Sequence, residues 1–197
     1  RKLGELGVHW DVLLDVQPAQ GHRFVMQTFP GGIHSGSDFY INDAGLVVGE
    51  TTVAQTPYDD RGTPQSNRIR KAVQYASTID ELVAIMTDRN NGQYTNEWPF
   101  ANVKTGEVGI FLLGTEKWRV WRSSQKDFPA GLTDFYWCNN NAKDLEVRKE
   151  YITNPDNAPV DLAFRPWNRD LAFVDFYNRT KGKIDAVAGV NFWATSP

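Results

Sequence analysis

Four short runs in the first quarter of the chain are rich in Trp, Val, Leu, Ile and Phe and are separated by Pro, Gly, Asn and Asp. Apolar strand formers that alternate with turn residues in this way are typical of antiparallel β-strands. The predicted strands are His9 to Val16, Arg23 to Phe29, Phe39 to Ile41 and Leu46 to Val53. We therefore expect the first quarter of the chain to form sheet.

The spacing of apolar residues then becomes helical. Ile69, Val73 and Ala76 fall on one helical face, and Thr78-Ile-Asp-Glu81 has the sequence of a capping box at the start of a second helix. Strand patterns return from Trp98 onward, and helical patterns close the chain. We predict helices at about 66–77, 79–89, 142–151 and 167–177, and a second sheet section at 98–103, 108–113, 117–121 and 135–139.

This order of strands, helices, strands and helices predicts an α+β fold, in which two stacked, mainly antiparallel sheets are flanked by helices. The regular strand-helix alternation of a doubly wound fold is absent from the pattern. A length of 197 residues suits one domain of ordinary size. We therefore predict a single domain over residues 1–197.

Composition narrows the functional classes. No apolar run approaches the roughly 20 residues of a membrane-spanning helix. A net charge of -3 provides no basic field for phosphate backbones, which argues against nucleic acid as a partner. The single cysteine, Cys138, excludes an internal disulfide and a multi-cysteine metal site, and the three histidines lack the pairing of a helical zinc site. We expect neither a metal nor an organic cofactor.

Three blocks of sequence carry a resemblance to a known family. They are Phe29 to Thr52, which contains Pro-Gly-Gly-Ile-His-Ser-Gly-Ser-Asp-Phe-Tyr and ends in Glu-Thr-Thr, Asn90 to Trp98, and Phe135 to Asn141. In order and approximate spacing they are similar to the phospholipase B-like proteins and their penicillin acylase-like relatives, a branch of the N-terminal nucleophile (Ntn) hydrolases. The resemblance extends from about Trp10 to Arg169.

The resemblance implies a four-layer αββα sandwich and an enzyme that hydrolyses an amide or ester bond of a small acylated substrate. In this family a cysteine exposed by autoproteolytic processing is the first residue of the catalytic chain. This chain begins with Arg1. We therefore expect the nucleophile upstream of Arg1, a fold that is incomplete at both ends, and an N-terminal segment or chain that completes it. The family also suggests a secreted, periplasmic or lysosome-like compartment.

Three catalytic residues are assigned by matching family motifs. Asn140 matches the strand-end Asn of the oxyanion hole, where an amide can donate to the developing negative charge. Thr51 matches a Thr beside the nucleophile, and Arg165 matches a late arginine whose planar fork could orient a carboxylate. Ordinary roles stay open, because Asn139 to Asn141 could form a turn and helix cap, Thr51 is a common strand residue, and Arg165 could lie on the surface.

His34, Asp38 and Asn96 are the predicted substrate-binding residues, since the family uses the blocks that contain them to line its cleft. For Asn96, bracing the cleft is the alternative role. For His34 and Asp38, the neighbouring Ser35 and Ser37 raise the question of a serine triad. Neighbours in sequence seldom have triad geometry, and no Gly-x-Ser-x-Gly elbow is present.

Two further alternatives remain at this point. Cys138 lies in a predicted strand, where a free cysteine usually acts as a small buried apolar side chain. An internal cysteine also lacks the α-amino group that serves an Ntn nucleophile as base. The rival to the enzyme hypothesis is a noncatalytic domain that retains the fold and cleft as a binding or interaction module.

Overall fold

The computed structural model describes residues 10–56, 58–129, 132–152 and 167–194. The chain divides into two compact units, residues 1–164 and 165–197. The prediction of a single domain over 1–197 is not tested by this division and stays a prediction.

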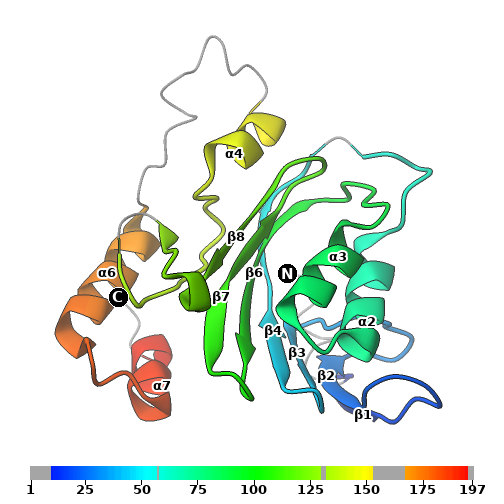
Figure 1. The fold of residues 1–197 in the computed structure, drawn as a ribbon, viewed down its shortest axis with the longest axis horizontal. Coiled ribbons are helices and arrows are strands. Elements are labelled where there is room, and N and C mark those ends of the chain that lie inside the picture. The colour runs from blue at the N-terminus through cyan, green and yellow to red at the C-terminus, as the bar shows by residue number, and fades with distance from the viewer. Residues whose placement is uncertain (1–9, 57, 130–131, 153–166, 195–197) are drawn as a thin grey trace. The chain divides into compact units, whose positions relative to one another are not determined.

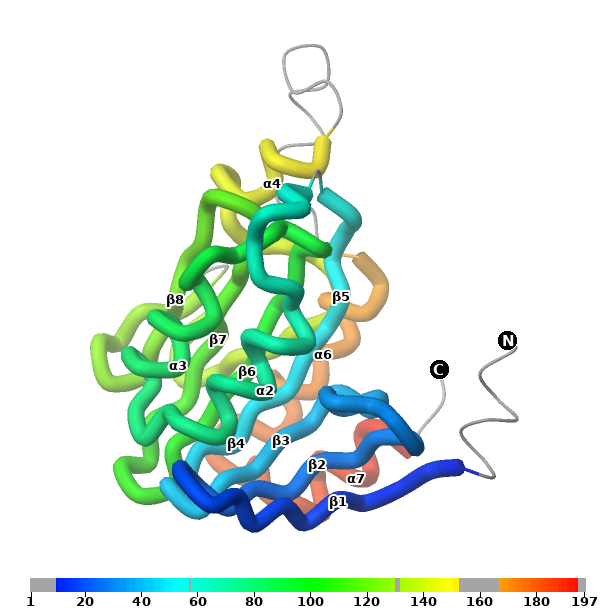
Figure 2. Tube along the Cα trace, turned by 90° about the vertical axis from the view of Figure 1, so that its right-hand side faces the viewer, coloured from blue at the N-terminus to red at the C-terminus, as the bar shows by residue number. Residues whose placement is uncertain are grey.

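In the described part of the first unit, eight strands form one antiparallel sheet with the order β1-β2-β3-β4-β6-β7-β8 (Figure 2). β4 and β5 follow one another along the same edge of β6, and both pair with it. The strands are β1 (Val12–Val16), β2 (Phe24–Thr28), β3 (Phe39–Asn42), β4 (Leu46–Gly49), β5 (Thr51–Ala54), β6 (Thr95–Asn102), β7 (Glu107–Leu113) and β8 (Trp118–Arg122).

Helices α2 (Gln65–Tyr75) and α3 (Ile79–Thr87) cover one face of this sheet (Figure 1). Successive strand residues point to opposite faces, so β7 contributes to two cores. Phe111 and Leu113 pack with the buried residues of α2 and α3, including Ile69 and Leu82. Ile110 and Leu112 belong to a second cluster on the opposite face. This second cluster also contains Trp121, Cys138, Ala142 and Val147, the last from α4 (Leu145–Tyr151).

The predicted capping box of α3 is confirmed. The backbone N–H of Glu81 donates to Thr78 Oγ1 at 3.2 Å, and the Thr78 N–H donates to Glu81 Oε2 at 3.2 Å. The pair satisfies donors that the first turn of a helix leaves without partners. α3 therefore begins where the sequence predicts.

Asn42, at the end of β3, joins the sheet to α2. Its side-chain amide donates to the carbonyl oxygens of Val73 and Ala76 at 3.0 and 2.9 Å, and its Oδ1 accepts from the Leu46 N–H at 3.0 Å. Only 4% of Asn42 is exposed. The two carbonyls lie at the C-terminal end of α2, where a helix has acceptors without intrahelical donors. One side chain thus ends a helix and closes the β3–β4 turn.

His22 ties together three surface turns. Its Nδ1 lies 2.9 Å from Asp43 Oδ1 and its Nε2 lies 2.9 Å from Ser77 Oγ. The three residues belong to the β1–β2 turn, the β3–β4 turn and the α2–α3 turn. The contacts fix the ends of two hairpins against the helical layer.

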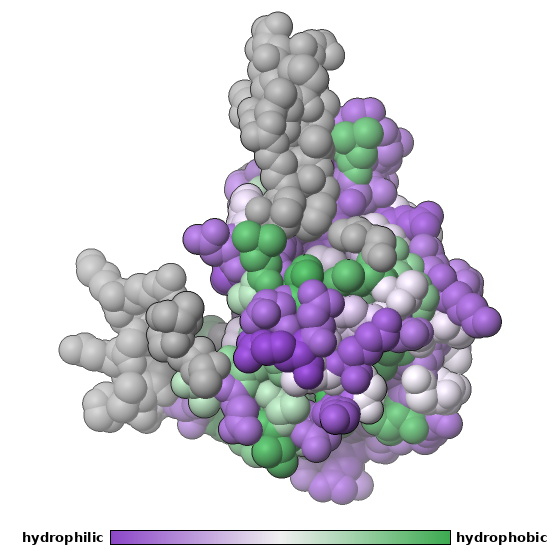
Figure 3. Space-filling view, turned by 90° about the vertical axis from the view of Figure 1, so that its left-hand side faces the viewer, coloured by the Kyte–Doolittle hydropathy of each residue, from purple (hydrophilic) through white to green (hydrophobic). Residues whose placement is uncertain are grey.

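The second unit contains α6 (Asn168–Thr180) and α7 (Ala186–Ala194). Phe192 of α7 packs against Phe173 and Phe176 of α6, with ring centroids 5.0 and 4.6 Å apart. Val187, Val190 and Trp193 of α7 are largely exposed. Exposed apolar residues are not confined to this unit, and Figure 3 shows them interspersed with hydrophilic residues over one face of the molecule.

The predicted α+β class with a mainly antiparallel sheet is confirmed. Two details are wrong. The segments between 98 and 122 continue the first sheet through β6, β7 and β8, because β6 pairs directly with β4 and β5. Residues 135–139 form no strand, and Asn139 lies in a bend. The second sheet of the four-layer sandwich stays a prediction, since all strands of the described residues lie in one sheet.

Helix boundaries also differ from expectation. α4 begins at Leu145, because Asp144 caps it by accepting from the N–H groups of Glu146 and Val147. Asn141, the expected cap, instead accepts from Arg148 Nη1 at 3.1 Å. A carboxylate at the N-cap is also favoured by the helix dipole.

We predict that Asn42→Ala lowers the free energy of unfolding by about 2 to 3 kcal/mol, because it leaves one buried N–H and two helix carbonyls without partners. Urea denaturation measured by circular dichroism gives this value. Asn67→Ala, an exposed change on α2, is the matched control and should alter stability by less than about 0.5 kcal/mol. Equal effects of the two variants would refute the proposed role of Asn42.

Candidate functional site

Glu50 interrupts the strand predicted from Leu46 to Val53. β4 pairs with the second half of β6 and β5 with its first half, and Glu50 lies between them. Its N–H donates to the carbonyl oxygen of Asp38 at 3.0 Å, just before β3 begins. Asp38 has φ 62°, a left-handed conformation that is uncommon outside glycine. The first residues of β3 and β5 therefore lie next to this residue pair.

The side chains of this junction form a carboxyl cluster, which we define as Asp38, Glu50, Thr52 and Asn96. Asn96 Nδ2 donates to Glu50 Oε1, and Thr52 Oγ1 donates to the same oxygen at 3.3 Å. The Asp38 carboxyl lies close enough for its negative charge to act on the Glu50 carboxyl. Because Thr52 is opposite Asn96 in the β5–β6 register, one buried carboxyl links three segments of the sheet.

Burial of Glu50, which is 9% exposed, raises the pKa of its carboxyl to about 8, and the negative charge of Asp38 adds to this effect. Loss of hydration also raises the pKa of Asp38, which lies at the surface. Two neighbouring carboxylates repel each other when both are ionised. At neutral pH the pair therefore retains a proton, and we place it on the more buried Glu50.

A second polar group lies on the opposite face of β6. The side chains of Glu97 and Lys143 are fully buried and form an ion pair, with Nζ and Oε1 2.8 Å apart. Glu97 Oε2 accepts the N–H of Asn139 at 3.2 Å, and Lys143 Nζ lies 4.9 Å from the ring centroid of Trp137. The pair thus holds the extended segment after residue 134 against the sheet.

Thr51 and Asn139 both neighbour this ion pair and carry buried polar atoms that lack partners. Thr51 is opposite Glu97 in the β5–β6 register, and the Asn139 backbone bonds to the Glu97 carboxylate. Thr51 Oγ1, Asn139 Nδ2 and Asn139 Oδ1 have no hydrogen-bond partner, although Asn139 is only 2% exposed. Such groups are rare in folded proteins, and strain, a catalytic role or a bound water or ion can account for them.

Asn140, the predicted oxyanion residue, lies beside the two threonines. Its Nδ2 donates to the carbonyl oxygen of Thr52, and its φ of 67° is left-handed. The residue connects the segment after β8 to the start of β5. The structure therefore brings Asn140 together with Thr51, while Asn139 carries the amide without partners.

The other predicted residues are distributed as follows. Asp38 and Asn96 belong to the carboxyl cluster, on the α2–α3 side of the sheet. His34 is half-buried, and its backbone carbonyl accepts from Thr28 Oγ1 at 2.8 Å. Arg165 lies outside the described residues, so its role stays a prediction.

Sequence reasoning missed Glu50, Glu97 and Lys143, and only the position of Glu50 directly after an apolar strand hinted at burial.

Cys138 is buried, as predicted, although it lies outside any strand. Burial raises the pKa of its thiol well above the usual range, with a further contribution from the Glu97 charge. A nucleophilic cysteine needs the opposite shift, toward the thiolate. Cys138 is therefore a packing residue of the second core.

The serine alternatives receive no support from the contacts. Ser35 Oγ accepts from the Phe39 N–H at 3.1 Å and is buried, and Ser37 is exposed. A hydrogen-bonded series of Ser, His and Asp side chains does occur, formed by Ser77, His22 and Asp43. Next to it, however, the Glu81 carboxylate accepts a hydrogen bond from the Ser77 N–H at 2.7 Å. An acyl-transfer site needs donors near its serine, and this carboxylate opposes a developing oxyanion.

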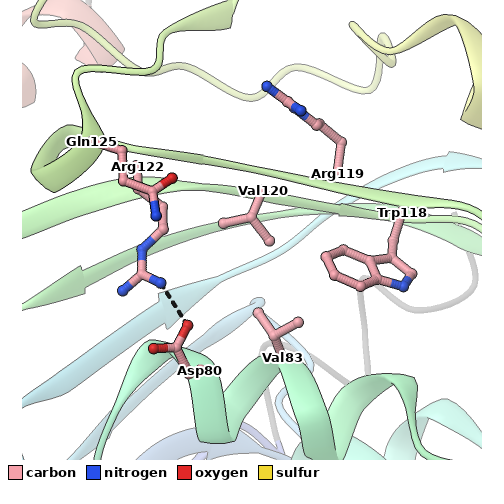
Figure 4. A pocket seen from close by; sticks show the side chains of 7 residues that line it. All are labelled: Asp80, Val83, Trp118, Arg119, Val120, Arg122 and Gln125. Carbon is pink, nitrogen blue, oxygen red and sulfur yellow. Dashed lines mark hydrogen bonds and ion pairs between the residues drawn. The ribbon is translucent and has the colours of Figure 1, made fainter.

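A surface pocket of about 320 Å³ lies between α3 and β8, away from these residues (Figure 4). Trp118, Val120 and Arg122 point from β8 toward α3, and Arg119 points away. The Arg122 guanidinium bonds to Asp80 at 2.5 Å and to Glu107 at 2.7 and 3.0 Å. Its charge is fully engaged by protein carboxylates, so the pocket offers little to an anionic ligand.

Comparison with known proteins shows which family the chain resembles. It is 24% identical to human phospholipase B-like 1 over 200 residues, which cover 93% of this chain and 35% of that protein. It is 28% identical to bovine phospholipase B-like 1 over 102 residues, which cover 49% of this chain and 19% of that protein. The chain resembles phospholipase B-like 1. The predicted branch is supported, and the chain spans about a third or less of the length of these relatives. No family model matches the chain.

Among solved structures, two variants of conjugated bile acid hydrolase from Clostridium perfringens superpose on the chain with a TM-score of 0.41 and 13% sequence identity. Each superposition covers 87% of this chain and 62% of the hydrolase. In the described ranges, no cluster of three His, Cys, Asp or Glu side chains could hold a metal ion. Within the same ranges, no helix is long and apolar enough to cross a membrane.

We predict that Lys143→Met lowers the free energy of unfolding by about 3 to 5 kcal/mol, because the buried Glu97 carboxylate would lose its cation. The double variant Lys143→Met/Glu97→Gln should recover a large part of this loss. Lys149→Met removes an exposed pair with Glu146 and serves as the control, with an effect below about 1 kcal/mol. Urea unfolding would contradict the prediction if the two single variants cost the same.

Proposed function

We propose that the chain forms the greater part of the catalytic domain of a phospholipase B-like Ntn hydrolase, which cleaves an amide or ester bond of a small acylated substrate. The observation that carries the proposal is the pair of buried groups without partners, the Thr51 hydroxyl and the Asn139 amide, beside Glu97. Both lie in sequence blocks that resemble the family. The word phospholipase in the names of the relatives does not establish a lipid substrate.

In the proposed reaction, the nucleophile is a cysteine upstream of Arg1 in the complete protein. Its thiolate attacks the carbonyl carbon, and the carbonyl oxygen takes up negative charge. The Asn139 amide is suited to donate to this oxygen, because it is buried and has no competing acceptor. The α-amino group of the same cysteine takes up the thiol proton and passes it to the leaving group as the bond to the carbonyl carbon breaks, and water then hydrolyses the thioester to the acid and the free thiol.

Thr51 and Asn140 have supporting roles in this proposal. The Thr51 hydroxyl would hold the attacking group or its amine by a hydrogen bond. Asn140 would keep β5 in place through its bond to Thr52, with Asn139 as the direct donor. Arg165 stays a proposed orienting residue. The substrate-binding roles of His34, Asp38 and Asn96 stay predictions, and the Asn96 side chain lies on the face of the sheet opposite to that of Thr51.

A noncatalytic binding domain is the alternative, because the same two groups could hold the amide or carboxylate of a ligand without chemistry. Intact mass and N-terminal sequencing of the mature protein distinguish the two. A catalytic chain that starts at a Cys supports the hydrolase. A protein with no Cys, Ser or Thr at a processing site supports the binding domain.

For the full-length protein, assayed with a panel of chromogenic N-acyl amides and acyl esters, we predict that Asn139→Ala lowers kcat by about 10²-fold to 10³-fold, the usual effect of losing one oxyanion donor. KM should change much less. Asn140→Ala should have a smaller effect on kcat, and Asn67→Ala should match the wild type. Unchanged turnover in Asn139→Ala, with folding intact by circular dichroism, would overturn the assignment.

A further inference from the structure

The turn between β7 and β8 presents three successive backbone N–H groups to one carboxylate of α4. The N–H of Thr115 donates to Glu150 Oε2 at 2.6 Å, and the N–H groups of Glu116 and Lys117 donate to Glu150 Oε1 at 2.9 and 2.6 Å. Successive N–H groups that converge in this way form a concave anion site. We call these three N–H groups the turn nest, and the Glu150 carboxylate fills it.

The turn is held by its acceptors as well as by its donors. Asn90 Nδ2 donates to the carbonyl oxygens of Gly114 and Thr115 at 2.7 and 3.0 Å, while Glu150 accepts from the N–H groups that follow. Gly114 leaves the space that the carboxylate needs, because a Cβ at this position would overlap with Glu150 Oε2. The turn nest is therefore a built site for this side chain.

The position of Glu150 is not explained by α4 itself. Glu150 lies in the last turn of α4, where the helix dipole favours a cation and disfavours a carboxylate. Arg148 and Lys149, in the same turn, follow this rule. A residue that breaks a local rule is expected to serve another part of the fold. For Glu150 that part is the turn nest.

Arg148 connects α4 to the segment that carries the proposed oxyanion donor. Its Nη1 donates to Asn141 Oδ1 at 3.1 Å and to the Ala142 carbonyl oxygen at 2.9 Å. Arg148 and Asn141 are both buried. The same segment begins at Asn139, whose N–H bonds to the carboxylate of residue 97 on β6. Residues 139–142 are thus held between the sheet and α4.

We propose that Glu150 is a positioning residue of the candidate site: by filling the turn nest it fixes α4, and through Arg148 it sets the orientation of the Asn139 amide. The link from Glu150 to residues 139–142 follows from these contacts alone. An effect on turnover rests in addition on the proposed hydrolase function.

Truncation of Glu150 would turn the nest into an anion site that a small carboxylate can enter. In Glu150→Ala the three N–H groups lose the carboxylate, and the turn that presents them keeps its sequence. Acetate replaces, atom for atom, the part of the side chain that this change removes. Because acetate is best enclosed when α4 is docked on the turn, its binding shifts α4 back toward that position.

The test follows the Asn139 side-chain amide signal in NMR spectra of the full-length protein, labelled with nitrogen-15 in its asparagine side chains and assigned with Asn139→Ser. In Glu150→Ala this signal should move from its wild-type position, and saturating acetate should return it. Glu146→Ala is the first control, because it removes an exposed carboxylate of the same helix, and it should leave the signal in place.

The double variant Gly114→Ala/Glu150→Ala is the second control. The added methyl group occupies the space of the carboxylate, so acetate should have no effect on its spectrum. This variant separates binding in the turn nest from a general effect of the salt.

Three results would overturn the inference: an Asn139 signal that stays in place in Glu150→Ala, a displaced signal that acetate does not return, or an equal response to acetate in the double variant. If Glu150→Ala fails to fold, Gly114→Ala provides the test, since its methyl group displaces the carboxylate without removing it. The Asn139 signal should then move, and an unchanged signal would refute the link.

Turnover separates this inference from the hydrolase proposal. With a substrate that the wild type cleaves, Glu150→Ala should lower kcat by about 10-fold to 10²-fold with a smaller change in KM, and acetate should recover most of the loss. If the Asn139 signal responds as expected and no acylated substrate is cleaved, the hydrolase proposal fails and the positioning by Glu150 stands. If turnover requires Asn139 while its signal ignores Glu150→Ala, the hydrolase stands and the positioning role fails.

Discussion

The position of β6 in the sheet determines where every polar group of the candidate site can lie. This strand pairs with β4 and β5 on one side and with β7 on the other, so its backbone groups face strands along both edges. Because neighbouring side chains point to opposite faces, Asn96 must enter the layer below α2 and Glu97 the layer beneath the extended segment. Two adjacent polar residues thereby organise two separate networks in a buried strand.

The hydrogen-bond network of Asn96 and that of Glu97 each contain a buried carboxyl, but the two carboxyls are stabilised in different ways. Glu97 keeps its charge and pairs it with Lys143, which has no exposed side-chain surface. Burial raises the pKa of Glu50 to about 8, so this carboxyl favours its neutral form at neutral pH. The groups between these networks, Thr51 and Asn139, satisfy neither condition. Thr95 Oγ1 and Trp98 Nε1 of β6 also lack hydrogen-bond partners, so the proposed role of Thr51 and Asn139 depends in addition on their position beside Glu97.

Local sequence patterns were sufficient to predict most helices and strands, but they did not predict which strands pair with one another. The strands of the first quarter, α3 and its capping box follow from periodicity and cap chemistry, which depend on neighbouring residues. The single sheet could not be predicted, because the β4–β6 pairing joins segments that two helices separate. The same limit applies to the site. Motifs predicted Thr51 and Asn140 as site residues, and the choice of Asn139 as the proposed donor depends on contacts that motifs do not contain, the bond from Asn140 to Thr52 and the Asn139 amide without partners.

The distance in sequence between the paired groups has a consequence for folding. Glu50 and Asn96 are 46 positions apart, Glu97 and Asn139 are 42 apart, and Thr52 and Asn140 are 88 apart. The hairpins β1–β2, β3–β4 and β6–β7 can each close early, because their loops are short, whereas these long loops carry a larger entropic cost. A chain that has formed only its hairpins and helices therefore has native secondary structure and no site.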